Sequence, residues 1–171
     1  QNAQFDKVAQ LFEEIKDLFL HKNGNELVSA DMQSYEATND KIWDTHADVF
    51  IPCAGSRMIS DEQLDRMINA GVNVISAGAN VPFADPEIFF GSIAEKADES
   101  IALIPDFIAN CGMARVFAYL MSNDLKKLED QKIFEDTSKI IKEALEATYK
   151  VNSKSTGLAK TAFEIALNQL I

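Results

Sequence analysis

Three short segments combine small residues with asparagine, and their chemistry suggests a binding site. They are residues 52–56 (PCAGS), 77–80 (AGAN) and 105–112 (PDFIANCG). Glycine and alanine let a backbone approach a flat ligand closely. The side-chain amides of Asn80 and Asn110 each offer a donor and an acceptor, which suits a ribose hydroxyl or a carboxamide. These residue types are also ordinary in loops, so one segment alone carries little weight, whereas three in equivalent places favour a binding site.

The other nucleophilic and metal-binding side chains form no cluster in the sequence. Cys53 and Cys111 are the only cysteines, and they lack the CxxC spacing and the neighbouring histidines of a metal or redox site. His21 and His46 share no motif. We therefore expect no metal site, and we expect both thiols to be buried and reduced.

Each of the three segments follows a short apolar run that is typical of a buried strand. The runs cover residues 48–52, 72–76 and 101–104, and helical patterns separate them. Alternation of strands and helices with short connections predicts a parallel sheet and an α/β fold. In such sheets ligands bind beyond the carboxyl ends of the strands, which is where the three segments should lie. A weaker strand is predicted near residues 35–37.

Local signals predict where the helices between these strands begin and end. Ser60 and Gln63 form a capping box that opens a helix, and Gly71 is expected to end it. Asp85 and Pro86 are expected to be the cap and the first residue of the next helix.

Apolar periodicity predicts helices at both ends of the chain. Residues 5–20 form an amphipathic pattern, and from residue 124 onward the pattern is helical only, with a break at residues 152–157. The second of the two C-terminal helices is too short to bury a core by itself, so we expect both to pack over the sheet. The prediction is a single domain, residues 1–171, in which residues 124–171 are a helical extension.

Composition and charge exclude several classes of function. The 171 residues are 47% hydrophobic, which is enough for one domain with a core. The formal net charge of -11 opposes a broad contact with the phosphate backbone of nucleic acid. No apolar run approaches the ~18 residues that a membrane-spanning helix needs, and the first residues lack the pattern of a signal peptide. We expect a cytoplasmic protein that binds neither nucleic acid nor membrane.

The three segments resemble, in order and spacing, part of the cofactor domain of the glutamate/leucine/phenylalanine/valine dehydrogenases. That family has Pro-(Ala/Cys)-Ala after one strand, Gly-Ala-Asn or Ser-Ala-Asn after the next, and Pro-Asp-(Phe/Tyr)-x-x-Asn-Ala-Gly after the last. The corresponding segments here are Pro52-Cys53-Ala54, Gly78-Ala79-Asn80 and residues 105–112. Trp43 also matches a tryptophan that is frequent before the first strand in glutamate dehydrogenases. The resemblance implies a partial Rossmann-like parallel sheet of about three to four strands, flanked by helices.

The resemblance also implies roles for single residues. The residues that would bind the cofactor, NAD or NADP, are Cys53, Ala54, Gly78, Ala79, Asn80 and Asn110. In the family, the turn after the first strand lines the adenosine side of the pocket, and the two asparagines hold the nicotinamide end through its ribose and carboxamide. Ala114 and Phe117 match positions close to the substrate. The implied reaction is reversible oxidative deamination of an L-amino acid, glutamate foremost, to a 2-oxo acid and ammonia.

The sequence also departs from the family. No GxGxxG occurs in it, so we expect the C-terminal part of a longer cofactor domain, inactive alone and without catalytic residues, from a protein that forms homo-oligomers. Met113 replaces a second glycine of the last motif, and Phe117 cannot hydrogen-bond the side-chain carboxylate of glutamate. These departures favour an alternative hypothesis, a non-catalytic cofactor-binding or regulatory module derived from the family.

Overall fold

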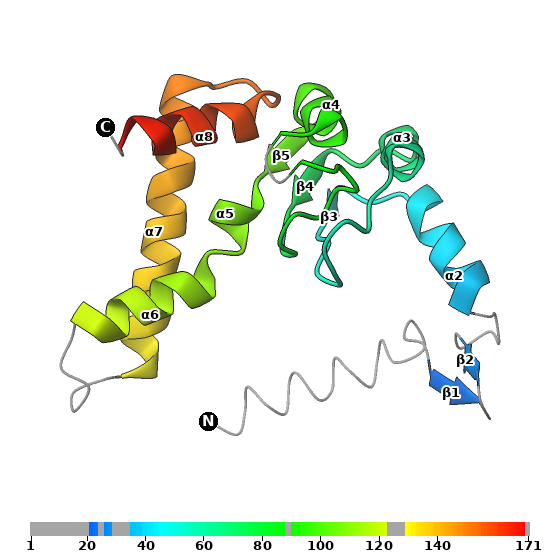
Figure 1. Cartoon of the computed structure of the whole chain (residues 1–171), viewed down its shortest axis with the longest axis horizontal. Coiled ribbons are helices and arrows are strands. Elements are labelled where there is room, and N and C mark those ends of the chain that lie inside the picture. Colours follow the sequence, from blue (N-terminus) through cyan, green and yellow to red (C-terminus); the bar gives the residue numbers. More distant parts are fainter. Residues whose placement is uncertain (1–20, 24–25, 29–34, 88–89, 123–128, 170–171) are drawn as a thin grey trace. The chain divides into compact units, whose positions relative to one another are not determined.

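The computed structural model describes residues 21–23, 26–28, 35–87, 90–122 and 129–169 (Figure 1). The chain divides into two units, residues 1–45 and residues 46–171. The helix expected at residues 5–20 lies outside the described residues. The assignment of residues 1–171 to a single domain stays a prediction.

The first unit contains a hairpin followed by two short helices. Strands β1 (His21–Asn23) and β2 (Glu26–Val28) pair in antiparallel register. The apolar pattern does not predict this hairpin, although Gly-Asn, the dipeptide between the two strands at residues 24–25, is common in two-residue hairpin turns. Helices α2 (Tyr35–Lys41) and η2 (Ile42–Asp44) follow. The strand predicted near residues 35–37 is therefore wrong, and an acidic residue in the first turn of α2 with a basic one in its last turn suits the helix dipole.

A three-stranded parallel sheet forms the centre of the second unit. Its strands are β3 (Val49–Phe50), β4 (Val74–Ser76) and β5 (Ala102–Ile104), in the order β3-β4-β5. All three strands of the sequence prediction are confirmed, each within its predicted run. The central residues of β4 and β5 are buried, Ile75 fully and Leu103 with 3% exposed, because helices pack against the sheet. The α/β fold that the sequence predicts is thereby confirmed.

Helix α3 (Asp61–Asn69) begins and ends as the sequence predicts. The Ser60 hydroxyl accepts a hydrogen bond from the Gln63 backbone N–H at 3.2 Å, and the Ser60 backbone N–H donates to Gln63 Oε1 at 2.8 Å. Gly71 follows the helix with a φ of +93°, a conformation that favours glycine. These signals are local, which is why the sequence alone contains them.

Helix α4 (Ser92–Ser100) begins later than predicted. The prediction that Pro86 is its first residue is wrong, because residues 86–87 and 90–91 are not helical and α4 starts at Ser92. Asp85 nevertheless caps α4 through space, since its carboxylate accepts hydrogen bonds from Ile93 N at 2.8 Å and Ala94 N at 3.0 Å. The side chain is 2% exposed, so this cap is internal.

In the described part of the chain, four helices follow β5. They are α5 (Asp106–Ala109), α6 (Gly112–Ser122), α7 (Asp130–Val151) and α8 (Leu158–Asn168). The predicted break at residues 152–157 is confirmed. Helix α8 packs directly against β5, and α7 packs against α5, α6 and α8 (Figure 1).

A buried carboxylate connects α4 to α8. Asp98 of α4 is 3% exposed, and its two carboxylate oxygens accept hydrogen bonds from Ala159 N at 2.8 Å and Lys160 N at 3.0 Å. Its backbone carbonyl accepts from the N–H of Gly157 at 2.7 Å, and that glycine has a φ of +73°. Asp98 therefore caps α8 and fixes where this helix starts on the sheet.

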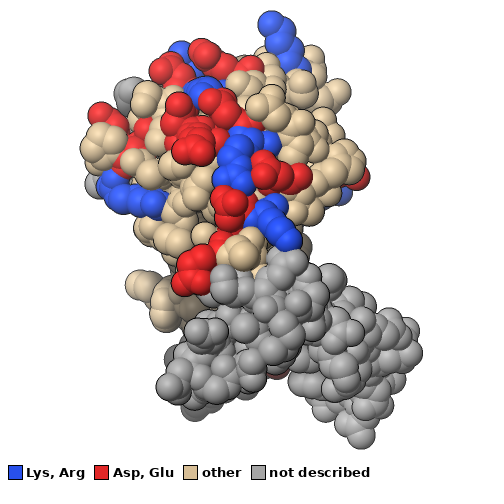
Figure 2. Space-filling view, turned by 90° about the vertical axis from the view of Figure 1, so that its right-hand side faces the viewer, with Lys and Arg blue, Asp and Glu red and all other residues tan. Residues whose placement is uncertain are grey.

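Charges of both signs intermingle on the surface. The face in Figure 2 has acidic and basic side chains side by side, without a separate basic patch. One example is Lys96 of α4, whose ammonium lies 2.7 Å from carboxylate oxygens of both Asp61 and Asp65 of α3. Among the described helices, none combines the length and the apolar character that crossing a bilayer requires.

Candidate functional site

The three segments lie side by side at the carboxyl edge of the sheet. Residues 52–56 follow β3, residues 77–80 follow β4, and residues 105–112 follow β5. The N–H of Ala79 donates to the Pro52 carbonyl at 2.6 Å, which joins the first segment to the second. The N–H of Ala77 donates to the Ile104 carbonyl at 3.0 Å, beside the third. The parallel register thus places the segments together, as expected for this class of sheet.

The first two segments are in close contact at Gly78. A Cβ atom at this position would lie 2.6 Å from Cys53 Sγ and 3.3 Å from the Pro52 carbonyl oxygen, so glycine is the residue that fits. Cys53 and Ala54 are exposed, whereas Ala79 is buried. The expectation that Cys53 is buried is therefore wrong, because the side chain follows the strand at its solvent-facing edge. Cys111 is half-buried, and both thiols are free.

The turn after Asn80 has an unusual backbone. Val81 has a φ of +47°, in the left-handed region that β-branched residues avoid. Its carbonyl accepts a hydrogen bond at 2.7 Å from the N–H of Arg57, which itself has a φ of +60°. The Arg57 guanidinium donates to the backbone carbonyl of Asp85. Arg57 thus holds the loops together.

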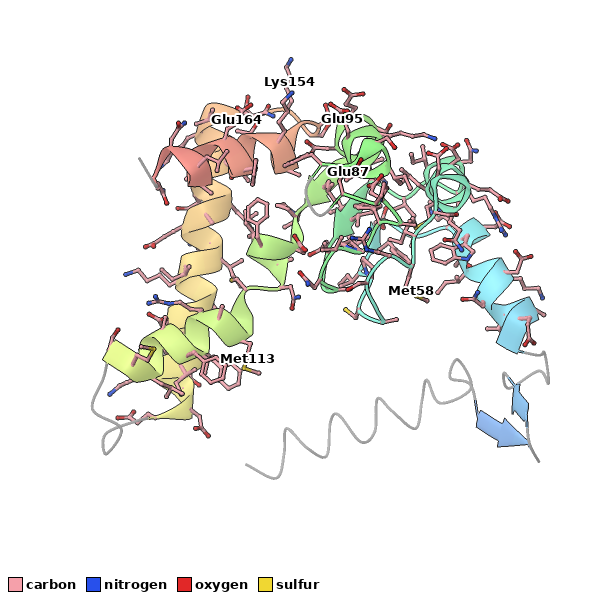
Figure 3. All side chains as sticks on the ribbon, viewed as in Figure 1. Met58, Glu87, Glu95, Met113, Lys154 and Glu164 are labelled. Carbon is pink, nitrogen blue, oxygen red and sulfur yellow. The ribbon has the colours of Figure 1, made fainter. Side chains whose placement is uncertain are left out.

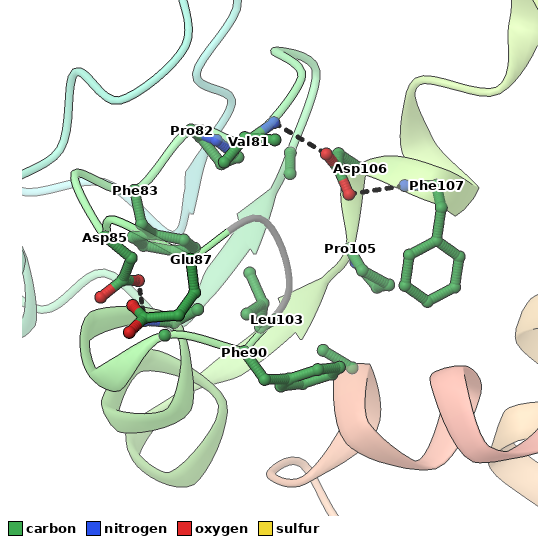
Figure 4. Close-up of a pocket in the computed structure, with 14 residues that line it drawn as sticks. Val81, Pro82, Phe83, Asp85, Glu87, Phe90, Leu103, Pro105, Asp106 and Phe107 are labelled. Atoms are coloured by element: carbon green, nitrogen blue, oxygen red, sulfur yellow. Dashed lines mark hydrogen bonds between the residues drawn. The ribbon is translucent and has the colours of Figure 1, made fainter.

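Asp106 connects this turn to the segment after β5. Its Oδ2 accepts a hydrogen bond from Val81 N at 2.8 Å, and its Oδ1 accepts from Phe107 N at 2.8 Å (Figure 4). The sequence suggests Asp106 as a helix cap, but the cap residue of α5 is Pro105 and Asp106 is the first helical residue. The bond to Val81 spans 25 residues, so no local pattern predicts it.

Asn80 and Asn110, the predicted nicotinamide-side residues, are both exposed. Asn110 ends α5, and its backbone N–H donates to the Asp106 carbonyl at 2.6 Å. Neither side-chain amide makes a hydrogen bond within the described part of the chain. Both amides are therefore available to a ligand.

The predicted substrate-side residues lie on α6. Ala114 and Phe117 are both exposed, with 59% of Phe117 accessible, and their three-residue spacing places them on one face of the helix. Met113, with 68% exposed, projects outward from the start of α6 (Figure 3). Helix α6 leads away from the sheet beyond α5 (Figure 1).

A two-pronged ion pair fixes α6 on α7. Arg115 Nε donates to Asp136 Oδ2 at 2.5 Å, and Arg115 Nη2 donates to Asp136 Oδ1 at 2.7 Å. Hydrogen bonding to Arg115 lowers the pKa of the Asp136 carboxyl below its ordinary value of 3.8. The guanidinium of Arg115 is therefore committed to this structural contact.

Acid should weaken the ion pair between Arg115 and Asp136, and the variant Asp136→Asn should lack this dependence on pH. Because the folded-state pKa of Asp136 is depressed, the stability it contributes is present above the unfolded pKa and is lost as the pH falls through the folded pKa. The difference in unfolding free energy between the unchanged chain and Asp136→Asn should thus shrink below about pH 4, measured by urea unfolding across pH. Glu143→Gln, on the same helix with an exposed 3.8 Å ion pair, is the control. A difference that is constant down to about pH 2 would contradict the effect.

Three cavities lie near the sheet, and none is lined by the predicted cofactor residues. A cavity of about 60 Å³ lies under the Val81 turn, between Asp85 and Asp106 (Figure 4). Two apolar cavities of about 470 and 450 Å³ lie beside α7 and α8 and share Ile108, Thr148 and Ala162. The candidate site is instead the open carboxyl edge. Among the described residues, no group of three or more His, Cys, Asp or Glu could hold a metal ion.

Comparison with known proteins decides the family. The model of the glutamate/leucine/phenylalanine/valine dehydrogenase family matches residues 4–171. The chain belongs to this family. A leucine dehydrogenase of Thermoactinomyces intermedius is 26% identical over 127 residues, which are 64% of this chain and 33% of that enzyme. The chain thus spans about a third of the length of that relative.

Solved structures support the Rossmann-type α/β fold of this chain. Plasmodium falciparum glutamate dehydrogenase matches with a TM-score of 0.55 and 18% identity over 70% of this chain and 26% of that one. L-tryptophan dehydrogenase from Nostoc punctiforme matches with a TM-score of 0.52 and 19% identity over 75% of this chain and 36% of that one. At these identities the similarity shows the fold alone.

Proposed function

We propose that the whole protein is an NAD(P)-dependent amino acid dehydrogenase and that this chain supplies the nicotinamide side of its cofactor-binding domain. The observation that carries the proposal is the carboxyl edge, where three family motifs lie side by side and two exposed amides have no partner within the described residues. Family membership supports the reaction class. By resemblance, we further expect a cytoplasmic homo-oligomer.

The residues at this edge fit a dinucleotide. Gly78 leaves no side chain between the first two segments, and the exposed Cys53 and Ala54 offer a small, flat surface for the adenosine side. Asn80 and Asn110 supply amide donors and acceptors, the groups that a ribose and a carboxamide require. We assign the adenosine side to Cys53 and Ala54, the backbone contact to Gly78 and Ala79, and the nicotinamide end to the two asparagines.

The proposed reaction is the oxidative deamination of an amino acid. An amino acid, oxidised cofactor and water give a 2-oxo acid, ammonium, reduced cofactor and a proton. When bound, the nicotinamide accepts the hydride that leaves the α-carbon of the substrate. The task of Asn80 and Asn110 is to hold the carboxamide and ribose so that one ring face meets the substrate, which is an orienting role. Other parts of the whole protein must supply the proton-transfer groups, so we expect this chain alone to be inactive.

The sequence and the structure favour different substrates. The resemblance favours glutamate. Helix α6 offers no free cation for a side-chain carboxylate, because its one basic residue, Arg115, is paired with Asp136. The exposed Met113 and Phe117 on the same helix favour an apolar amino acid.

A substrate panel with the whole protein tests the proposal. Glutamate, leucine, valine, phenylalanine and tryptophan are each offered with NAD and with NADP, and formation of the reduced cofactor is followed by absorbance. Reduction that depends on an amino acid supports the dehydrogenase, and the preferred substrate decides between the acidic and apolar readings. A protein that neither binds nor reduces either cofactor would refute the proposal.

Met113 and Phe117 favour one alternative, a cofactor-binding or regulatory module without catalysis. Their bulky side chains stand where the family has a glycine and a small or apolar residue, and both are exposed on α6. The same panel separates the two functions. The module would bind the cofactor and would reduce none with any amino acid.

A further inference from the structure

The turn that carries Asn80 has a backbone that its own sequence disfavours. Val81, the next residue, has a φ of +47°, and a β-branched side chain is unfavourable in this region. Asparagine and glycine enter the region readily, whereas valine requires surrounding contacts that hold it there. The position of Asn80 therefore depends on the groups that hydrogen-bond Val81.

Two hydrogen bonds hold the backbone of Val81, one at its carbonyl and one at its N–H. Its carbonyl accepts from Arg57 N at 2.7 Å, and its N–H donates to Asp106 Oδ2 at 2.8 Å. The Arg57 bond comes from a backbone N–H. The Asp106 bond comes from a side chain, so a substitution that retains the backbone can remove it.

Asp106 is bonded to both asparagine-bearing segments at once. Its carboxylate holds the residue after Asn80, and its backbone carbonyl accepts the N–H of Asn110 at 2.6 Å. Its second oxygen accepts from Phe107 N, which locks the side chain against the first turn of α5. Figure 4 shows the carboxylate between Val81 and Phe107. One residue thus sets the spacing between the turn of Asn80 and the end of α5.

We propose that Asp106 is a positioning residue, which fixes Asn80 relative to Asn110 so that both amides meet the nicotinamide half of one cofactor. The inference rests on the proposed function. Asp106 acts through Val81 and α5 and makes no contact with the cofactor itself. Substitution of such a residue should weaken binding of the nicotinamide half of the cofactor and leave binding of the adenosine half unchanged.

Two ligands separate the two halves in the whole protein. One is the reduced cofactor, NADH or NADPH according to the preference of the unchanged protein. The other is ADP, or its 2′-phosphate, which lacks both the nicotinamide and the ribose attached to it. Asp106→Asn keeps the shape of the side chain but has one acceptor oxygen, so it cannot accept from Val81 N and Phe107 N together, and its amide nitrogen faces one of these two N–H groups. Asp98→Asn is the matched control, because Asp98 also accepts two backbone N–H bonds, and it holds α8.

The Kd of the reduced cofactor should rise about tenfold in Asp106→Asn, which is about 1.4 kcal/mol, while the Kd of ADP changes less than about twofold. Asp98→Asn should change neither Kd more than about twofold. Equal weakening of both ligands by Asp106→Asn, or no weakening, would overturn the inference and leave the proposed function standing. Failure of the unchanged protein to bind either ligand would overturn the proposed function and the inference with it.

A second substitution tests the backbone argument directly. Glycine adopts positive φ without strain, so Val81→Gly should keep the turn in place after the Asp106 bond is lost. The double variant Val81→Gly, Asp106→Asn should recover at least about threefold of the tenfold loss in cofactor affinity. A double variant no better than Asp106→Asn alone would show that Val81 is not the residue through which Asp106 acts, and would overturn the inference. Thermal unfolding of each variant checks that the proteins compared are folded.

Discussion

Asn80→Ala and Asn110→Ala should each lower kcat/KM of the whole protein about a hundredfold, which corresponds to about 2.7 kcal/mol of transition-state stabilisation. Each amide would orient the nicotinamide or its ribose, and a displaced reacting group costs about this much in rate. The unfolding free energy should change by less than about 0.5 kcal/mol, because both side chains are exposed and neither makes a hydrogen bond within the described residues.

This combination makes the result easy to interpret. A loss of rate without a loss of stability means that the side chain acts on the bound ligand and not on the fold. Asn69→Ala is the control, since Asn69 is also exposed but ends α3, whose chain leads into the amino end of β4 at the opposite edge of the sheet. Steady-state kinetics and urea unfolding are measured on the same preparations. Changes in kcat/KM of less than about threefold in both asparagine variants would contradict their assignment to the nicotinamide end.

The sequence predicted the parts of the fold that rest on local signals. The capping box at Ser60 and Gln63 involves residues three apart, and its two hydrogen bonds are those expected. The apolar runs gave all three strands, but the prediction that each is buried holds only for the central residues of β4 and β5. In β3 it is wrong, because 49% of Val49 is exposed. The place of the candidate site at the carboxyl edge follows from these strands, because consecutive parallel strands point the same way and their carboxyl ends lie at one edge of the sheet. The segments at 52–56, 77–80 and 105–112 were thereby predicted to meet.

The parts that the sequence missed depend on contacts between distant residues. The sequence predicts that Asp85 caps a helix that begins beside it. Asp85 instead caps α4, which begins at Ser92, and does so from a buried position. The bond between Asp106 and Val81, and the bond between Arg57 and Val81, join separate loops. Nothing in the composition of a loop shows which distant N–H its carboxylate will meet. These contacts decide how the site is held, and the motifs decide which residues it contains.

Asp98→Ala should lower the unfolding free energy by about 3 kcal/mol. The carboxylate is 3% exposed and accepts two charge-assisted bonds at the start of α8, where the helix dipole also favours a negative charge. Alanine would leave the N–H of Ala159 without an acceptor, and Ala159 is only 1% exposed, so water cannot replace the carboxylate without local opening. An unpaired buried N–H costs about 1–3 kcal/mol, and the bond to Lys160 is lost as well.

Urea unfolding of the chain measures this loss, and hydrogen exchange locates it. Amides of α8 should exchange faster in Asp98→Ala, while those of α3, which has its own capping box, should change little. Glu99→Ala, at the exposed neighbouring position of α4, should cost less than about 0.5 kcal/mol. A loss below about 1 kcal/mol for Asp98→Ala would mean that α8 is held by its packing on β5 and not by the cap. Asp98 and Asp106 each join distant backbone groups, but their substitution should have different effects. Loss of Asp98 should lower stability, because Asp98 holds a helix to the sheet, whereas loss of Asp106 should lower cofactor affinity, because Asp106 holds the turn that carries Asn80.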